Sequence, residues 1–515
     1  SWSLEVNQAA AEFGHSVARA GDVNGDGYGD LIVGARLYDN GQTDEGRAFV
    51  FHGSSSGLLT LPSWSDENDQ AFASFGASVA SAGDVNGDGY GDVLVGAPDC
   101  DNGLTDEGCA YVYHGSPSGL SSGSSWSADG NQASANFGLS VSGAGDVNAD
   151  GYADVIVGAY LHDNGHMNEG SAYAYLGSRT GLASTPVWQT ESDSTQAAYG
   201  RTVAAGGDLN GDSYSDVLVA AYTLTDDQFN EGRVYAYMGG SAGLSTSPLW
   251  TADGNQAGAF FGQALASAGD VNGDGYGDVV VGAPGYGDGQ TNEGRGYVYL
   301  GSATGPAASP DWTVESDQAF ALLGGSAASA GDVNGDGYGD VIFGAVGYDG
   351  DLSDEGRAWI WLGNAGHGGL VRELQQRTRA GTRPISVVGS MGESGLFRIR
   401  CDFHKNAAGF AWAASASPEA WLEWEVKPLG IPFDGSGVQQ GDAQSLVPAG
   451  GMLTFDELAS IDDATGHVRT TQARSYRWRA RVATNSPLFP HTAWFSAQGS
   501  SINEAKLRKP KRESP

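Results

Sequence analysis

Oxygen-bearing side chains recur at fixed spacing in a nine-residue stretch, residues 22–30. Positions 1, 3, 5 and 9 of this stretch carry side-chain oxygens, from Asp22, Asn24, Asp26 and Asp30. Position 6 is Gly27, where a short loop must turn sharply, and the carbonyl of Tyr28 at position 7 adds a fifth oxygen. Carboxylates this close together repel one another unless a cation lies between them. Because Ca²⁺ prefers oxygen ligands from short flexible loops, the stretch predicts a calcium loop.

The loop occurs six times, each copy 62 residues after the last. The side-chain ligands of the other copies are Asp84, Asn86, Asp88 and Asp92; Asp146, Asn148, Asp150 and Asp154; Asp208, Asn210, Asp212 and Asp216; Asp270, Asn272, Asp274 and Asp278; and Asp332, Asn334, Asp336 and Asp340. The carbonyls at position 7 belong to Tyr90, Tyr152, Tyr214, Tyr276 and Tyr338. The chain therefore predicts up to six calcium ions. We expect the fourth loop to bind most weakly, because Ser213 replaces the glycine at position 6 and a positive φ costs a non-glycine residue about 1 kcal/mol.

Short apolar runs rich in β-branched residues flank each loop. In the first unit they cover residues 30–35 and 47–52, bounded by Gly, Asn, Asp and Ser. This pattern is typical of strands and turns, without helical periodicity. We expect four strands per unit, at 14–19, 30–35, 47–52 and 63–65 in the first. A four-stranded sheet repeated at this period predicts an all-β fold, a β-propeller of six four-stranded blades over residues 1–363.

The ends of the repeated region predict how the ring closes. Trp2 lies 62 residues before Trp64, so the chain begins with a lone fourth strand, and the pattern ends after the third strand of the sixth unit. We expect the N-terminal strand to complete the sixth blade, which would leave no open sheet edge. Seven blades remain an alternative, if the next segment of the chain lends strands.

The repeated residues resemble a known family. Phe13 and Gly14 open the unit, the loop at 22–30 follows, and Val33, Gly34 and Ala35 come after it, with Gly-Ala-Pro in the second and fifth units. This order resembles the FG-GAP repeat of integrin α-subunit propellers and related bacterial surface proteins. The resemblance covers about 370 of the 515 residues. It implies a calcium-binding β-propeller; integrin propellers have seven blades with cation loops in only some, whereas this chain has six units and six loops.

A different composition begins after residue 363. We expect a Gly-rich linker at 364–383, a β-sandwich loosely similar to fibronectin domains at 384–500, and a basic, flexible tail at 501–515. Residues 397–403, 422–426 and 476–482 alternate apolar and charged side chains. Such alternation is typical of half-buried antiparallel strands, on which the β-sandwich prediction rests.

The net charge of the chain changes near the place where its composition changes. Residues 1–370 hold 8 Arg, no Lys and 48 Asp plus Glu, a net charge of −40, whereas residues 371–515 hold 18 basic and 14 acidic residues, net +4. The acidic part would repel nucleic-acid phosphates and anionic lipids, so we expect neither nucleic-acid binding nor membrane insertion. Opposite charges on the two parts favour contacts between molecules. We therefore expect a protein partner or self-association, with a glycan as a further candidate ligand.

Catalytic signals are weak. Two Gly-x-Ser-x-Gly matches, at 53–57 and 119–123, fall in predicted turns that no helix can follow, and the nine histidines lack metal-ligand spacing. We expect no enzyme and no catalytic residue. The predicted function is a secreted or cell-surface calcium-stabilised propeller that acts in adhesion or as a structural subunit of an extracellular assembly. The alternatives are a carbohydrate-binding lectin and, less favoured, an extracellular hydrolase or lyase.

Location follows from calcium availability. Extracellular modules bind calcium at about 10⁻⁴ to 10⁻³ M, which matches the concentration outside cells, so we expect an extracellular or cell-surface protein. The sequence contains no Asn-x-Ser/Thr motif, which favours a prokaryotic source.

Two further sets of residues carry structural predictions. Cys100 and Cys109 stand where the fifth unit has Tyr286 and Arg295, a large pair at the mouth of a predicted hairpin, so we expect cross-strand neighbours and a disulfide. A glutamate recurs in the loop before the third strand of each unit, at the end of the sheet away from the calcium loops: Glu45, Glu107, Glu169, Glu231, Glu293 and Glu355. These carboxylates could form a ligand-binding ring, or they could accept hydrogen bonds from their own hairpins, which we favour.

Overall fold

The computed structural model of this chain describes residues 3–333, 338–350 and 352–363 in full, and the backbone pairing of strands between Val371 and Lys509. Every regular element in this part of the chain is a β-strand. The prediction of an all-β fold is therefore confirmed for the described residues.

Five antiparallel sheets of four strands follow one another along the chain, and a sixth has three strands among the described residues. The first comprises β1 (Phe13–Gly21), β2 (Asp30–Ala35), β3 (Arg47–Phe51) and β4 (Trp64–Glu67). The second and third comprise β5 (Ser78–Gly83), β6 (Asp92–Ala97), β7 (Cys109–Tyr113) and β8 (Trp126–Asp129), then β9 (Phe137–Gly145), β10 (Asp154–Ala159), β11 (Ser171–Tyr175) and β12 (Trp188–Glu191). The fourth and fifth comprise β13 (Tyr199–Gly207), β14 (Asp216–Ala221), β15 (Arg233–Tyr237) and β16 (Trp250–Asp253), then β17 (Ala264–Gly269), β18 (Asp278–Ala283), β19 (Arg295–Tyr299) and β20 (Trp312–Glu315). The sixth comprises β21 (Leu323–Gly331), β22 (Asp340–Ala345) and β23 (Arg357–Trp361).

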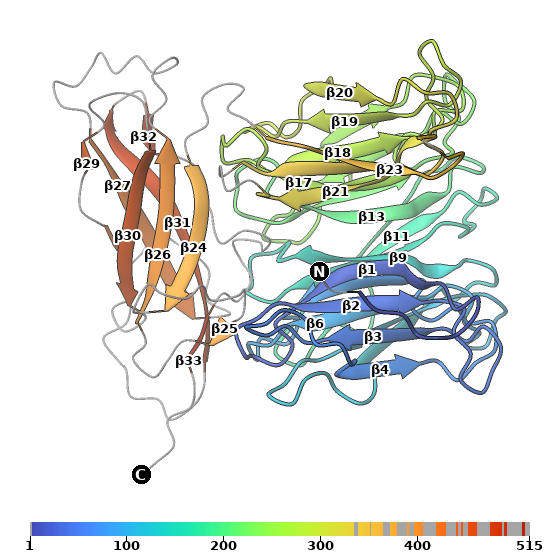
Figure 1. Cartoon of the computed structure of the whole chain (residues 1–515), viewed down its shortest axis with the longest axis horizontal. Coiled ribbons are helices and arrows are strands. Elements are labelled where there is room, and N and C mark those ends of the chain that lie inside the picture. Colours follow the sequence, from blue (N-terminus) through green and yellow to red (C-terminus); the bar gives the residue numbers. More distant parts are fainter. Residues whose placement is uncertain are drawn as a thin grey trace.

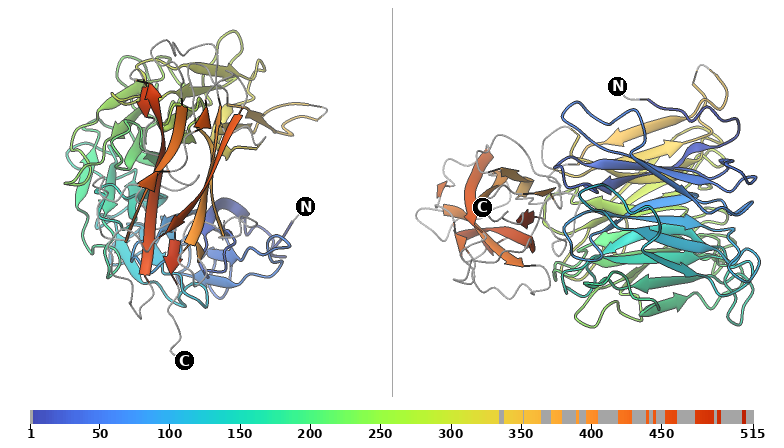
Figure 2. Two further views of the ribbon diagram at one scale, coloured as in Figure 1. Left: turned by 90° about the vertical axis from the view of Figure 1, so that its left-hand side faces the viewer. Right: turned by 90° about the horizontal axis from the view of Figure 1, so that it is seen from below.

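The sheets are the blades of a β-propeller (Figures 1 and 2). The first strands of successive sheets contact one another, and the fourth strands lie outermost. Apolar side chains fill the space between neighbouring sheets. Ile32 and Val50 of the first sheet, for example, share one buried cluster with Val93 and Val95 of the second. Burial of both faces explains why the second strand of each unit reads as a continuous apolar run.

Two recurring contacts set the distance between blades. A side chain on Gly34 would place its Cβ 1.9 Å from the carbonyl oxygen of Gly76 in the next blade, so only glycine fits there. At the outer edge, Trp64 Nε1 donates a hydrogen bond to the carbonyl of Ser121, 2.9 Å away in the next blade. The same tryptophan contact recurs at Trp126, Trp188 and Trp250.

Among the described residues, the apolar packing that joins neighbouring sheets does not occur between the sixth sheet and the first. Ile360 is 49% exposed, whereas its equivalents in the first and fifth sheets, Val50 and Val298, are 0% and 4% exposed. Leu4 and Val6 pack instead against the first sheet, in the cluster that contains Phe51. In the described part of the chain, residues 3–5 form no strand with β23, and Trp2 lies outside it, so closure of the sixth blade by the N-terminal strand stays a prediction.

The strands beyond residue 370 form two further sheets. One has the order β24 (Val371–Thr378), β26 (Leu396–His404), β30 (Met452–Ser460); the other contains β25 (Gly389–Ser390), β33 (Leu507–Lys509), β31 (Arg474–Ser486), β27 (Glu419–Pro428) and β28 (Gln439–Gln440), with β29 (Gln444–Ser445) on β27 and β32 (Phe489–His491) on β31. Strands occur where alternation predicted them, at β26, β27 and β31. The β-sandwich itself stays a prediction.

Two strands lie outside the bounds predicted for the β-sandwich. Strand β24 lies inside the predicted linker and pairs with β26, and strand β33 lies inside the predicted tail and pairs with β31. Both segments are rich in polar or basic residues, and their strand structure depends on partners far away in the sequence. Local propensity cannot register such partners.

Candidate metal centres

The first predicted loop connects β1 to β2 and is wrapped around the carboxylate of Asp22, which is 0% exposed. Asp22 Oδ1 accepts a hydrogen bond from the Asp26 amide at 3.1 Å, and Asp22 Oδ2 accepts one from the Gly27 amide at 2.9 Å. Asp26 Oδ1 in turn accepts a bond from the amide of Tyr28 at 2.9 Å. Asn24 Nδ2 donates a hydrogen bond to Asp26 Oδ2 at 3.0 Å, and Asn24 Oδ1 accepts one from the Asp26 amide at 3.0 Å.

Asp30, the last predicted side-chain ligand, also acts as a clamp. Its Oδ2 accepts a hydrogen bond from the Val23 amide at 2.8 Å, and its Oδ1 accepts one from the Gly53 amide at 2.7 Å. The carboxylate thereby joins the loop to the turn that follows β3. Each carboxylate oxygen has a second lone pair, so these bonds leave acceptor capacity for a cation.

Both arrangements recur around the propeller. The carboxylate at position 9 accepts bonds from the same two backbone positions in the other five units, at Asp92, Asp154, Asp216, Asp278 and Asp340. The bonds to the carboxylate at position 1 recur at Asp84, Asp146, Asp208 and Asp270. In the sixth loop Asn334 and Asp336 lie outside the described residues.

These carboxylates are electrostatically unfavourable without a cation. Burial, together with repulsion from Asp30 and Asp26, raises the pKa of Asp22 to about 7. Burial and repulsion from the aspartate four residues later raise the pKa of Asp84 to about 8, of Asp270 to about 7 and of Asp208 to about 6. A bound divalent cation would remove this cost, and the all-oxygen donor set suits a hard ion such as Ca²⁺.

Backbone strain distinguishes two of the loops. Ser213 has a φ of 75°, the positive value expected at position 6. Ala149 in the third loop, which was not among the residues singled out from the sequence, has a φ of 59° where the first loop has Gly25 with a φ of 70°. The substitution was visible in the sequence as Asn-Ala-Asp in place of Asn-Gly-Asp. Both loops hold a non-glycine residue in a region that favours glycine.

The recurring glutamates lie at the opposite end of the sheets and bond their own hairpins, as favoured. Glu107 Oε1 accepts hydrogen bonds from the amides of Asn102 and Leu104, at 2.8 and 3.0 Å. The same kind of bond occurs at Glu45, Glu169, Glu231, Glu293 and Glu355. Their primary role is therefore to shape the loop between the second and third strands.

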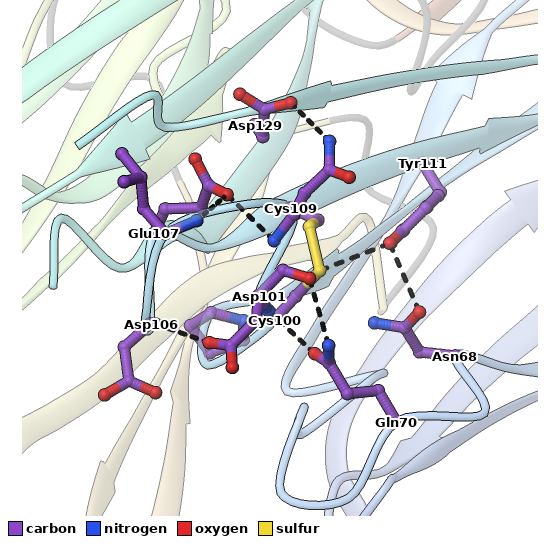
Figure 3. Close-up of a disulfide and its surroundings, with 12 residues drawn as sticks. Asn68, Gln70, Cys100, Asp101, Asp106, Glu107, Cys109, Tyr111 and Asp129 are labelled. Carbon is purple, nitrogen blue, oxygen red and sulfur yellow. Dashed lines mark hydrogen bonds between the residues drawn. A yellow bond between two sulfur atoms is a disulfide. The ribbon is translucent and has the colours of Figure 1, made fainter. Parts of the chain in front are cut away.

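A disulfide joins Cys100 and Cys109 at the mouth of the hairpin between β6 and β7 (Figure 3). Each cysteine is 3% exposed, and the hydroxyl of Tyr111 lies 3.5 Å from Cys100 Sγ. The bond covalently links the loop after β6 to the start of β7. The third cysteine, Cys401, has a side chain outside the described residues.

The family model of the FG-GAP repeat matches residues 13–51, 75–113, 137–175, 199–237 and 261–299. Each match begins at or shortly before the first strand of a unit and ends at the last residue of its third strand. The chain thus carries five matched FG-GAP repeats, and the sixth unit continues their spacing.

Curated relatives include integrin α subunits. The chain is 39% identical to integrin alpha-IIb of Mus musculus over 164 residues, 34% identical to integrin alpha-PS2 of Drosophila melanogaster over 198 residues, and 36% identical to integrin alpha-5 of Xenopus laevis over 172 residues. These alignments cover 30%, 36% and 31% of this chain but only 16%, 14% and 16% of the relatives. Among solved structures, Sqt1 of Saccharomyces cerevisiae aligns with 77% of this chain and 94% of its own, at 10% identity and a TM-score of 0.36. No helix in the described part of the chain is long and apolar enough to cross a membrane.

Proposed function

We propose that this chain, which contains an FG-GAP β-propeller resembling those of integrin α subunits, is a calcium-stabilised module of an extracellular or cell-surface protein. It acts in adhesion or as a structural subunit of an extracellular assembly. The observation that carries the proposal is the repeated loop, which places three aspartates and an asparagine at positions 1, 3, 5 and 9 in unit after unit. Up to six calcium ions would bind, one per loop.

Calcium would make the propeller rigid through the clamp aspartates. An ion held by Asp22, Asn24, Asp26 and Asp30 would join a loop whose last carboxylate already bonds the turn after β3. Each ion would then fix the loop at one end of its blade, and the loops of all the blades lie at that same end. If the propeller is rigid, the loops at its opposite face can bind a partner with a smaller loss of conformational entropy, because the fold already orders them.

The opposite face supports a protein partner. Exposed apolar side chains lie in the loops at this end: Phe72 (61%), Met167 (53%), Phe229 (69%), Phe320 (61%) and Leu352 (71%). A protein partner at this face would remove these side chains from water. Several amides that could bind a sugar are already bonded; Gln70, for example, donates to the carbonyl and accepts from the amide of Asp101. We therefore favour a protein partner over the lectin alternative, and no catalytic role is proposed.

An extracellular setting agrees with two features of the molecule. Calcium loops of modest affinity are filled at the concentrations outside cells, and the buried Cys100–Cys109 disulfide is typical of an oxidising compartment. The net charge of −40 on residues 1–370 opposes nucleic-acid binding. It also favours contact with the +4 segment of a second molecule.

Sedimentation velocity of the full chain tests the assembly proposal. In excess calcium we expect association at 0.1 M salt that weakens at 1 M salt, because the Debye length falls from about 10 Å to about 3 Å. Replacing Phe72, Phe229 and Phe320 by serine should weaken the contact if it uses the loop face, whereas replacing Leu61, Val187 and Leu249, exposed apolar residues of the turns at the other end, should not. A monomer at every salt and calcium concentration would contradict the assembly role.

A further inference from the structure

Two clusters of carboxylates lie at the end of the propeller away from the calcium loops. We name them the first acidic triad, Glu45, Glu67 and Asp69, and the second acidic triad, Glu293, Glu315 and Asp317. Within each triad, one carboxylate oxygen from every residue lies within 4.8 Å of the others. Each triad combines the loop before the third strand, the last residue of the fourth strand, and the loop that leaves the blade.

A buried oxygen in each triad has no hydrogen-bond partner. Glu45 is 0% exposed; its Oε1 accepts bonds from the amides of Asn40 and Gln42, and its Oε2 is buried without a partner. Glu293 repeats this arrangement, with Oε1 bonded to the Asp288 amide and Oε2 buried without a partner. Because Oε1 is held by the loop, Oε2 is the oxygen left to face the triad. A buried carboxylate oxygen without a partner is costly, so this pair of oxygens indicates a missing ligand.

Arginine neutralises each triad only in part. Arg47 Nη1 lies 3.4 Å from Glu67 Oε2, and Arg295 Nε donates to Glu315 Oε1 at 2.5 Å. Each triad thus has one guanidinium against three carboxylates. The unpartnered oxygens of Glu45 and Glu293 receive no bond from either arginine. Negative charge therefore remains where these oxygens lie.

Each of the other blades differs from the triads in at least one feature. The second and fourth blades replace the last aspartate by Asn131 and Asn255, and the glutamate of the fourth strand by Asp129 and Asp253. The third blade keeps Glu191 and Asp193, but there the Nδ1 atom of His166 lies 3.2 Å from Glu169 Oε2 and partners it. Among the blades whose loops and fourth strands are described, the first and fifth therefore have both features: a buried glutamate oxygen without a partner, and all three carboxylates.

We propose that the two acidic triads are divalent-cation sites, distinct from the calcium loops, and that calcium is the ion they take. Their donor atoms are all carboxylate oxygens, which suit a hard ion with flexible coordination. A cation at each triad would satisfy the buried glutamate oxygen and tie the loop before the third strand to the loop that enters the next blade. It would stiffen the loop face at two blades of the ring.

Counting bound calcium tests this inference on the full chain. We choose Asp69→Asn combined with Asp317→Asn, because asparagine occupies these positions naturally in two other blades. The backbone also accepts it: φ is 53° at Asp69 and 55° at Asp317, against 50° at Asn131 and 53° at Asn255. Both aspartates are exposed, so the double variant should fold like the wild type.

Equilibrium dialysis with radioactive calcium, at concentrations that saturate the wild type, should find two fewer ions per chain in the double variant. The matched control is Asp193→Asn in the third blade, where His166 already partners the glutamate; it should bind as many ions as the wild type. A double variant that binds as many ions as the wild type would overturn the inference. The same ion count tests the calcium loops independently of the triads. If the loops bind no calcium, the wild type would hold only the two triad ions, and the double variant would hold none.

Discussion

The guanidinium of Arg295 lies over the ring of Tyr286, with its central carbon 3.8 Å from the ring centroid. In the second blade the equivalent positions are held by Cys109 and Cys100, which form a disulfide. A cation–π contact in one blade and a covalent bond in another therefore close the same hairpin at the same point. The 62-residue spacing made this correspondence visible before the contacts were known.

Removing the disulfide should destabilise the propeller. We expect Cys100→Ser combined with Cys109→Ser to lower the free energy of unfolding by about 2 to 3 kcal/mol, because the bond restricts the unfolded chain. Urea unfolding of both proteins in calcium measures the difference. A Cys100→Tyr/Cys109→Arg variant, which copies Tyr286 and Arg295, should recover part of the loss. Two free thiols at these positions in the native protein, found by mass spectrometry, would contradict the pairing.

The fourth calcium loop should contribute least. Ser213 has a φ of 75°, which costs a serine about 1 kcal/mol relative to glycine. Asp212→Ala should therefore lower the melting temperature in calcium less than Asp26→Ala does, and Ser213→Gly should raise it. Thermal melting followed by circular dichroism makes the comparison. An Asp212→Ala variant that is as unstable as Asp26→Ala would show that strain does not weaken this loop.

Without calcium, the propeller should lose stability as the pH rises. The pKa values of Asp22 and Asp84 are raised to about 7 and about 8, against an ordinary value of 3.8. A group whose pKa is raised in the folded state stabilises the fold at low pH, and this contribution is lost as the pH rises through the folded-state pKa.

In a chelator, the melting temperature should therefore fall between about pH 5 and pH 8. Excess calcium should abolish or reverse the fall, because the ion competes with protons for the same oxygens. A melting temperature that rises with pH in the chelator would contradict the electrostatic account of the loops.

The ends of the propeller should meet at Glu5 and Arg357. Arg47 pairs with Glu67 across β3 and β4, and Arg295 pairs with Glu315 across β19 and β20. If the N-terminal segment completes the sixth blade in the same register, Glu5 would lie opposite Arg357. A Glu5→Cys/Arg357→Cys variant should therefore form an intramolecular disulfide, detected by mass spectrometry of the non-reduced protein. The control, Glu5→Cys/Arg295→Cys, should form none. Failure of the first pair to link would favour an open ring or a seventh blade.

Much of the propeller could be predicted because one pattern repeats. The strands, the positions of the aspartate-rich loops between them and the pairing of Cys100 with Cys109 all follow from positions 62 residues apart. Local sequence did not reveal contacts between segments far apart in the chain. Strand β24 lies within the predicted linker, and its partners in β26 lie between 19 (Thr378 to Phe397) and 32 (Val371 to Phe403) residues further along the chain.

The acidic triads escaped sequence analysis for the same reason. Glu45 and Glu67 meet only because β3 and β4 pair in a particular register. The signal was present, since glutamate and aspartate stand together at the fourth-strand end of the first, third and fifth units. The third unit carries this pair too, but there His166 already partners Glu169, and this contact is not visible in the sequence.

Thermal melting of the full chain in calcium and in a chelator tests the central claim most directly. Six loops that each gather three aspartates predict that removing calcium lowers the melting temperature on the order of tens of degrees, and that adding calcium back restores it. Equal melting temperatures in calcium and in chelator would contradict the claim that calcium stabilises this propeller.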